Sequence, residues 1–248
     1  MTASRTLKLL MALAFVACRS FAQDAQREKA LSAIKDLADR YQNAPALSFD
    51  VSYVYTDEAK PGIVLDSLKG SFKMDKDAYC YSIDKTESIG NKDYVLMLFK
   101  EDNLMYISKP STSTRLVSPI AMFDSLLSGN KNVSCTILES KAEKRMVFTF
   151  SPGLKYKKIE YWISKETGYV TTMAYCIRTS ELMPASTSGL PSDISPYASI
   201  EVAFTNYKTK GFDTRELDMG LYFKKENGEY TVAPAYSTYK IFLGSTNL

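Results

Sequence analysis

The sequence predicts an α+β protein: an incomplete antiparallel β-barrel of about ten or more strands, covered by an N-terminal amphipathic helix and a short mid-chain helix. Three observations support this prediction. Apolar residues recur at helical spacing over one segment near the start of the chain, and the spacing then changes to strict alternation over many short segments. Seventeen Tyr and twelve Phe against one Trp also favour strands, because aromatic side chains are enriched in sheets.

The first segment, residues 1–22, has the features of an export signal. Basic residues precede an unbroken apolar run, Leu9–Ala17, and Ser20–Ala22 provides small residues for cleavage. The run is about half of the ~20 residues that span a bilayer, so no stable transmembrane insertion is expected. Phe15–Cys18 also resembles a bacterial lipobox, which would leave a lipid anchor on Cys18. We expect a periplasmic protein, either soluble or, in the alternative, anchored through this cysteine.

The covering helix is expected over Ala25–Gln42. Its apolar residues recur every three or four positions, and charged residues occupy the other face. Asn43 and Pro45 end it. The apolar stripe consists of Ala30, Leu31, Ile34, Leu37, Ala38 and Tyr41.

A meander of short strands follows the helix. Leu47–Thr56 alternates apolar and polar residues, as a strand with one buried face does. Later segments repeat this alternation or are apolar throughout, and tight polar turns join them, which is typical of an antiparallel sheet. The later strands are expected at Leu68–Met74, Ala78–Ile83, Tyr94–Phe99, Leu104–Ile107, Val133–Leu138, Met146–Phe150, Lys155–Ile163, Tyr169–Ile177, Ser199–Tyr207, Gly220–Lys224, Tyr230–Val232 and Tyr236–Leu243.

Two segments interrupt the strands. A short helical stretch, Ile120–Leu127, lies between a Ser-Pro opening and a Gly-Asn ending. Residues 179–196 hold three Pro and many Ser, which indicates an inserted loop or, in the alternative, a mobile lid. The mature chain, 23–248, is therefore expected to be one half-barrel domain with this loop and an extended strand region at 211–248.

The sequence offers little reaction machinery. It contains no His, so Ser-His-Asp triads, Cys-His pairs and His metal ligands are all excluded. It also contains no Walker loop, no GxSxG elbow and no HExxH motif. Glu160, Glu166 and Glu201 are conceivable acid–base residues, but nothing in their spacing selects them. We expect no catalytic residue, no metal and no cofactor.

Three cysteines remain beyond the export signal, Cys80, Cys135 and Cys176, and each lies in an apolar, strand-like stretch. In an oxidising compartment, three cysteines allow at most one intramolecular disulfide. The alternative is that they are small buried apolar residues. No Cys-x-x-Cys pair occurs, so the sequence supports no zinc knuckle.

The net charge of +3 belongs to the export signal. Residues 1–22 contain three of the 31 basic residues and none of the acidic ones, so the rest of the chain has 28 bases and 28 acids. A neutral domain has no electrostatic attraction to nucleic acid or to an anionic membrane. We therefore expect no nucleic-acid partner.

Several motifs within residues 26–210 form a recognisable pattern. They are Leu68-Lys69-Gly70-Ser71-Phe72, Tyr79-Cys80-Tyr81, Glu101-Asp102-Asn103-Leu104-Met105-Tyr106, the stretch from Ser118-Pro119 to Ser128-Gly129, Tyr161-Trp162-Ile163 and Val202–Tyr207. Together they resemble the periplasmic outer-membrane lipoprotein-sorting carriers, the LolA/LolB-like family. Tyr81, Asp77 and Asn103 stand where that family commonly has Trp, Pro and Gly. The Arg that many carriers use inside the barrel has no clear counterpart.

The resemblance, the export signal and the apolar strand faces together indicate a non-enzymatic carrier or chaperone. It would hold lipoprotein acyl chains or other lipids in an apolar concave face, where each buried methylene contributes about 0.8 kcal/mol. The candidate ligand-binding residues are Phe49, Val51, Tyr53, Phe72, Met74, Leu96, Leu98 and Met105, with Leu31, Ile34 and Leu37 from the covering helix.

A second hypothesis is a structural or adaptor component of a bacterial envelope assembly. It would use the same fold with a filled interior, and its C-terminal strands would pair with an envelope protein through exposed edges. An envelope hydrolase is a third hypothesis, for which the sequence names no acid or base.

Overall fold

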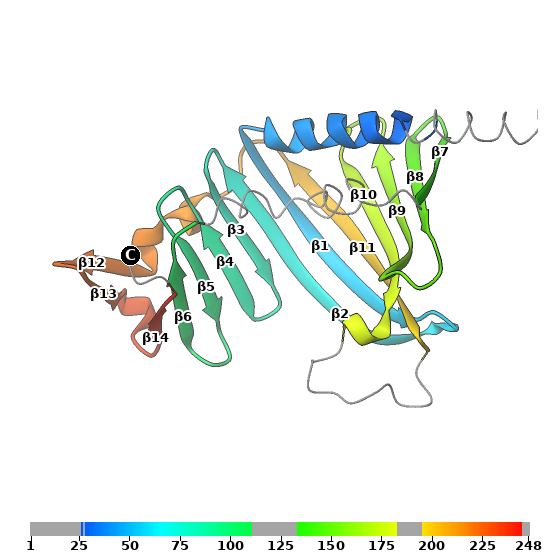
Figure 1. The fold of residues 1–248 in the computed structure, drawn as a ribbon. Coiled ribbons are helices and arrows are strands. Elements are labelled where there is room, and N and C mark those ends of the chain that lie inside the picture. The colour runs from blue at the N-terminus through cyan, green and yellow to red at the C-terminus, as the bar shows by residue number, and fades with distance from the viewer. Residues whose placement is uncertain (1–25, 27, 111–132, 183–194, 245–248) are drawn as a thin grey trace, which may run out of the picture.

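A twelve-stranded sheet runs through most of the chain that the computed structural model describes, which is residues 26, 28–110, 133–182 and 195–244. The strand order is β14-β6-β5-β4-β3-β2-β1-β11-β10-β9-β8-β7, and the sheet is twisted and curved (Figure 1). The strands are β1 (Ala46–Asp57), β2 (Lys60–Asp75), β3 (Ala78–Ile83), β4 (Thr86–Gly90), β5 (Val95–Phe99), β6 (Leu104–Ser108), β7 (Val133–Glu139), β8 (Glu143–Phe150), β9 (Tyr156–Ser164), β10 (Val170–Arg178), β11 (Tyr197–Lys208) and β14 (Lys240–Leu243).

The structure confirms the predicted α+β class and the curved, largely antiparallel sheet. One pair departs from it, because β14 runs parallel to β6, with Ile241 opposite Met105. Between β11 and β14 the chain forms a separate hairpin and three short 3-10 helices. These are η2 (Arg215–Leu217), η3 (Met219–Leu221), β12 (Phe223–Glu226), β13 (Glu229–Val232) and η4 (Pro234–Tyr236).

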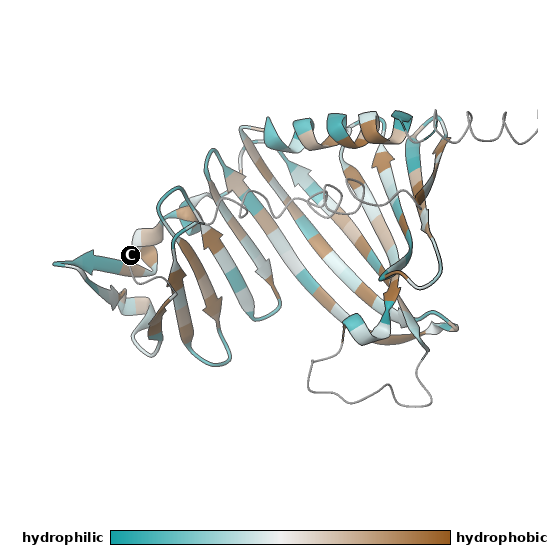
Figure 2. Ribbon diagram, in the orientation of Figure 1, coloured by the Kyte–Doolittle hydropathy of each residue, from teal (hydrophilic) through white to brown (hydrophobic). Residues whose placement is uncertain are grey.

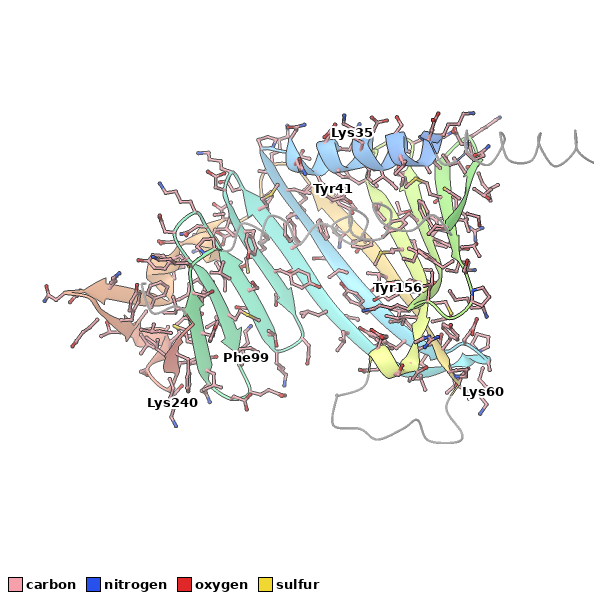
Figure 3. All side chains as sticks on the ribbon, in the orientation of Figure 1. Lys35, Tyr41, Lys60, Phe99, Tyr156 and Lys240 are labelled. Carbon is pink, nitrogen blue, oxygen red and sulfur yellow. The ribbon has the colours of Figure 1, made fainter. Side chains whose placement is uncertain are left out.

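The N-terminal helix, described at residues 26 and 28–42, crosses one end of the long strands (Figure 1). Its buried side chains occur at helical spacing, as the sequence predicts, and consist of Ala30, Ala33, Ile34, Leu37 and Tyr41. In Figure 3, Tyr41 points from the helix toward the sheet, whereas Lys35 points away from it. The backbone N–H of Asn43 donates to the carbonyl of Asp39, and the helix ends there.

We call the side of the sheet that carries Phe49, Phe72 and Val202 the inner face. Paired residues of neighbouring strands lie on the same side of a sheet, and here Phe49 pairs with Phe72 and Val51 with Phe204. The main core forms where this face meets the helix, and it draws on β1, β2 and β7 to β11. Alternation along β8 and β11 therefore gives one buried face, as expected.

A second core lies on the opposite side of the sheet. Lys73 of β2 points away from Phe72, and its partner Cys80 belongs to this second core. The segment from η2 to β14 covers the outer side of β3 to β6, where Leu217, Met219 and Phe223 pack. Thus β3 to β6 are covered on their outer side, whereas β1 and β8 to β11 bury their inner side.

The structure also corrects and completes several sequence expectations. Thr86–Gly90 is a strand that the sequence analysis did not name, and β2 begins at Lys60 rather than at Leu68. The inserted loop begins with a 3-10 helix, η1 (Thr179–Glu181). The export signal, Cys18 and the mid-chain helix Ile120–Leu127 lie outside the described residues, as do residues 183–194 of the loop.

Candidate functional site

The end of the inner face under the helix is closed by a ring of three hydrogen bonds. The Tyr207 hydroxyl donates to the carbonyl of Val170 at 2.8 Å, and the Val170 N–H donates to the Tyr41 hydroxyl at 3.3 Å. Because each phenol has a single proton, Tyr41 must donate across the 2.8 Å contact to Tyr207. Tyr169 stacks on Tyr207 with ring centroids 4.8 Å apart. This end of the sheet is a packed support for the helix.

Further along the inner face the side chains become half-buried, and most of them are tyrosines. We define the tyrosine cluster as Tyr53, Tyr55, Tyr81, Tyr156 and Tyr175. The Tyr53 and Tyr81 hydroxyls are 3.0 Å apart, and the rings of Tyr53 and Tyr55 are stacked with centroids 6.4 Å apart. Tyr156 meets Tyr175 edge to face at 6.2 Å. Figure 3 shows Tyr156 among the long strands, away from the helix.

Register explains why these rings share one face. Tyr53 pairs with Val202 and Tyr55 with Ile200 on β11, and these two residues pair with Met173 and Tyr175 on β10. On the other side, Phe72 of β2 pairs with Tyr81 of β3. The cluster thus draws its rings from four strands, β3, β1, β10 and β9, and extends across the six neighbouring strands from β3 to β9.

Four phenols of the cluster have a raised pKa, which favours their neutral form. Burial is the main cause that raises the pKa of Tyr55, Tyr81, Tyr156 and Tyr175, and for Tyr55, Tyr81 and Tyr175 neighbouring phenols add to the effect. Apart from Asp66, which pairs with Tyr55 and is exposed, the inward residues of the surrounding strand centres carry no charge. They are Val51, Leu68, Phe72, Ile83, Ile159, Met173, Ile177, Ile200 and Val202. With Asp66 only at its margin, the arrangement is a largely uncharged aromatic surface with hydroxyl groups, which suits an apolar molecule with a few oxygen acceptors.

Several predicted site residues line this inner face. Phe49, Val51, Phe72 and Met74 are 3–8% exposed and belong to the main core, whereas Tyr53 is half-buried in the tyrosine cluster. From the helix, Ile34 and Leu37 pack into the same core. Leu31 is 42% exposed and lies outside it.

Three predicted site residues lie elsewhere. Leu96, Leu98 and Met105 are fully buried in the second core, on the outer side of the sheet. Their strand neighbours Met97 and Phe99 face inward instead, because Phe72, Tyr81, Ser88 and Met97 follow one another across paired strands. The structure therefore does not bring the predicted set together on one face.

The predicted set of site residues lacks four members of the tyrosine cluster, Tyr55, Tyr81, Tyr156 and Tyr175. The signal was present, since Tyr53 and Tyr55 alternate within one strand, as do Tyr79 and Tyr81. A list chosen by hydrophobicity leaves out residues with a hydroxyl group, although their rings are largely apolar.

One of the conceivable acid–base residues, Glu160, and the three described cysteines are engaged or shielded, whereas Glu166 and Glu201 are exposed. Glu160 accepts from Arg145 at 2.7 Å and forms an ion pair with Lys158 at 3.0 Å. Burial alone would raise the pKa of Glu160, but these two cations outweigh it and lower the pKa. Cys80, Cys135 and Cys176 are buried free thiols. Burial raises the pKa of Cys80 to about 12 and those of the other two to about 11.

Two hollows lie apart from the tyrosine cluster and are lined by charged groups. One, of about 330 Å³, lies where the helix meets the β9–β10 turn, next to Arg40 and Lys165. The other, of about 610 Å³, lies near Lys92, Tyr94 and Lys225. In the part of the chain that the structure describes, no group of three or more acidic or cysteine side chains is placed to hold a metal ion. Within the same residues, no helix has the length and apolar character to cross a membrane.

Comparisons with protein-family models and with curated proteins find no match. Comparison with solved structures finds similar chains. An uncharacterised conserved protein from Thermus thermophilus has a TM-score of 0.42 and 10% identity over 76% of this chain and 92% of its own. A LolA superfamily protein from Nitrosomonas europaea has a TM-score of 0.33 and 9% identity over 76% and 97%.

The lipoprotein LppX of Mycobacterium tuberculosis has a TM-score of 0.37 and 12% identity over 74% of this chain and 96% of its own. A LolA superfamily protein is thus among the similar structures, as the sequence resemblance suggested. At TM-scores below 0.5, the ligand and activity of this chain have to be argued from its own residues.

Proposed function

We propose that this protein is a non-enzymatic periplasmic carrier or chaperone that binds lipoprotein acyl chains or other lipids. The observation that supports it best is the uncharged tyrosine cluster on an otherwise packed inner face, where every ring except that of the buried Tyr156 is half-buried. A packed core would bury these rings fully, whereas a surface that receives a ligand leaves them partly exposed. The expected export signal supports the periplasmic location.

The proposed contact surface is a revised set of residues. It keeps Tyr53 and adds Tyr55, Tyr81, Tyr175 and Met97, which are half-buried on the same face. Phe49, Val51, Phe72 and Met74 form the packed wall behind it, with Ile34 and Leu37 above that wall. Leu96, Leu98 and Met105 support the sheet from the outer side.

The hydroxyl groups favour a ligand with oxygen acceptors. The Tyr53 and Tyr81 hydroxyls share one hydrogen bond, and the phenol that accepts it keeps its own proton available. An ester carbonyl next to an acyl chain would accept that proton. A free carboxylate gains less, because no cation lies among the inward residues of these strand centres.

Displacement of a fluorescent fatty-acid ester, together with native mass spectrometry, tests this proposal. A Tyr81→Lys variant places a charge in the cluster and should weaken binding at least tenfold. The control is Leu138→Lys, at a side chain that is 49% exposed on β7 and pairs with Arg145 on the side away from the inner face. Failure of the unaltered protein to bind any acyl lipid, or equal binding by both variants, would overturn the proposal.

A structural or adaptor role in the envelope is the second candidate. Its support is the edge strand β14, where Phe242 and Leu243 are each 52% exposed. Such a strand can accept a partner through its edge. A stoichiometric protein partner recovered from envelope extracts, without bound lipid, would favour this role.

A further inference from the structure

The tip of the β1–β2 hairpin exposes three consecutive apolar side chains. Ile63, Val64 and Leu65 are 52%, 59% and 53% exposed. The hairpin lies at the end of the long strands opposite the helix, and Lys60 marks its tip (Figure 3). Figure 2 shows hydrophobic ribbon at this end of β2. Large apolar residues exposed side by side commonly mark a surface that contacts something else.

Nothing else in the described part of the chain pairs with this end of β2 on its free side. Pairing with β3 begins at Gly70, and the Lys69 carbonyl accepts from the Asp84 N–H at 2.9 Å, which leaves Lys60–Leu68 without a neighbour there. On the β1 side the register shifts twice, so that Asp57 faces Lys60 and Thr56 faces Val64. The residues between Lys60 and Val64 therefore bulge out of the ladder.

The backbone of this tip is poorly suited to accept another strand. Pro61 has no N–H, and the register shifts twist the edge away from a regular ladder. The N–H of Ser67 donates to the Asp66 carboxylate at 2.7 Å, so this donor is already engaged. These are the devices by which natural edge strands avoid pairing. A partner at this tip would therefore contact its apolar side chains rather than pair with its backbone edge.

The carboxylates around the tip are already engaged as well. Asp57 accepts from the backbone N–H of Ala59 at 2.8 Å and of Ser195 at 3.2 Å. Burial alone would raise the pKa of Asp57, but these N–H groups outweigh it and lower the pKa. Glu58 forms an ion pair with Lys157. Lys60 adds a cation at the tip.

The direction of the side chains distinguishes between possible contacts. Val64 pairs with Thr56, whereas Ile63 and Leu65 have no partner on β1, so the three side chains do not share one regular strand face. A groove on a partner protein would cover a single face. All three residues are exposed to a similar degree, which suits an apolar medium that surrounds the tip.

We propose that Ile63, Val64 and Leu65 enter the interfacial region of a phospholipid bilayer. Apolar groups of interfacial segments lie roughly 5–10 Å deep, at the boundary of headgroups and acyl chains. At that depth hydrated headgroups still satisfy the backbone of the bulge, which the hydrocarbon interior would not. Lys60 can extend its ammonium group to a lipid phosphate. The proposal adds a membrane contact and does not require the inner face to hold lipid.

Flotation with vesicles of phosphatidylcholine alone tests the proposal. The exported chain, without residues 1–22, should float with the vesicles, and binding should persist at high salt because the contact is apolar. A variant with Ile63→Ser, Val64→Ser and Leu65→Ser should bind at least tenfold more weakly. The matched control replaces three other exposed leucines, Leu138, Leu221 and Leu243, which are 48–52% exposed, by Ser.

A fluorescence measurement gives an independent readout. Trp162 is the one tryptophan of the chain, so Val64→Trp in a Trp162→Phe background reports on the tip alone. Its emission should shift to the blue when vesicles are added. Equal vesicle binding by the tip and control variants, or no blue shift, would overturn the proposal. So would a dimer that the tip variant loses, because the tip would then bind a second copy.

The result can be separated from that of the proposed carrier function. Without vesicles, the tip variant should bind the fluorescent ester as tightly as the unaltered protein does. The Tyr81→Lys variant should lose ester binding and keep its vesicle binding.

Discussion

Tyr41 is the residue on which the seating of the helix depends most. It is 2% exposed, and its hydroxyl belongs to the hydrogen-bonded ring with Tyr207 and Val170. Tyr41→Phe leaves the Val170 N–H buried without its acceptor, a loss that costs about 1–3 kcal/mol. We expect a decrease of this size in the free energy of unfolding, measured in urea.

Two further variants make this expectation specific. Tyr106→Phe alters an exposed phenol and should change stability by less than about 0.5 kcal/mol. The double variant Tyr41→Phe, Tyr207→Phe should lose less unfolding free energy than the two single variants lose in sum, because both hydroxyls belong to the same ring of hydrogen bonds. Strictly additive losses would contradict the ring.

The same phenol predicts how stability changes at alkaline pH. Burial raises the pKa of Tyr41 to about 12 from an ordinary value of about 10. The contribution of the neutral phenol is therefore complete below pH 10 and is lost as the pH rises through 12. At about 1.4 kcal/mol per pKa unit, it amounts to about 2–3 kcal/mol. Urea unfolding between pH 8 and 12 should show this loss, and the unfolding free energy of Tyr41→Phe should fall less steeply with pH.

Individual residues were predictable where only one face of an element is buried. Ile34 and Leu37 follow from helical spacing, and Phe49 and Val51 from strand alternation, and all four lie in the main core. Leu31 also fits the helical stripe but lies at its margin, where the sheet does not reach it. Spacing gives the direction of a side chain, whereas burial depends on how far the neighbouring element extends.

At the scale of elements, β5 shows why the site was only partly predictable. Its sequence, Val95–Phe99, is apolar at every position, so alternation cannot tell one face from the other. The strand is apolar on both faces because the C-terminal segment covers one side, while the other side continues the inner face. Only the pairing register assigns Leu98 to the outer core and Met97 to the inner face.

Neighbouring substitutions in β5 test that assignment. Leu98 is fully buried, so Leu98→Ala should cost about 2–5 kcal/mol and leave ester binding by the folded protein unchanged. Met97→Ala, at a half-buried position, should cost less stability but weaken ester binding several-fold. Urea unfolding and ester displacement measure the two effects. The opposite pattern would show that Leu98, rather than Met97, faces the ligand.

Other elements were missed because their residues lack a periodic signal. In β4, Thr86, Glu87 and Ser88 are polar, and the strand exists because β3 and β5 pair with it on both sides. The first half of β2 is exposed at every residue from Lys60 to Ser67, so no burial pattern marks it. Long-range pairing decides both cases, and local sequence does not encode it.

The whole molecule has two cores on opposite sides of one sheet. The main core depends on the helix, and the second depends on the segment from η2 to β14. The sequence indicated a curved sheet and a helix, and it marked 211–248 as an extension. It could not show that this extension packs on the outer side of β3 to β6, because that needs the register of β2 with β3.

Cysteine reactivity can report on the two cores separately. Cys80 lies in the second core, whereas Cys135 pairs with Phe148 in the main core. Phe223, which is 5% exposed and meets Tyr94 edge to face at 5.4 Å, fixes the C-terminal segment to the sheet. In a Cys18→Ser background, Phe223→Ser should therefore open the second core and speed thiol labelling of Cys80.

The matched variant Phe148→Ser, at a residue that is 1% exposed, should instead speed labelling of Cys135. The unaltered protein should label slowly at both sites, because burial shields the thiols and raises their pKa. Mass spectrometry of partly labelled protein identifies which cysteine has reacted. If both variants release Cys80 and Cys135 together, the two cores open as one cooperative unit. If each variant releases its own cysteine, the sheet can keep one side packed while the other opens, and the C-terminal segment can then move without disturbing the inner face.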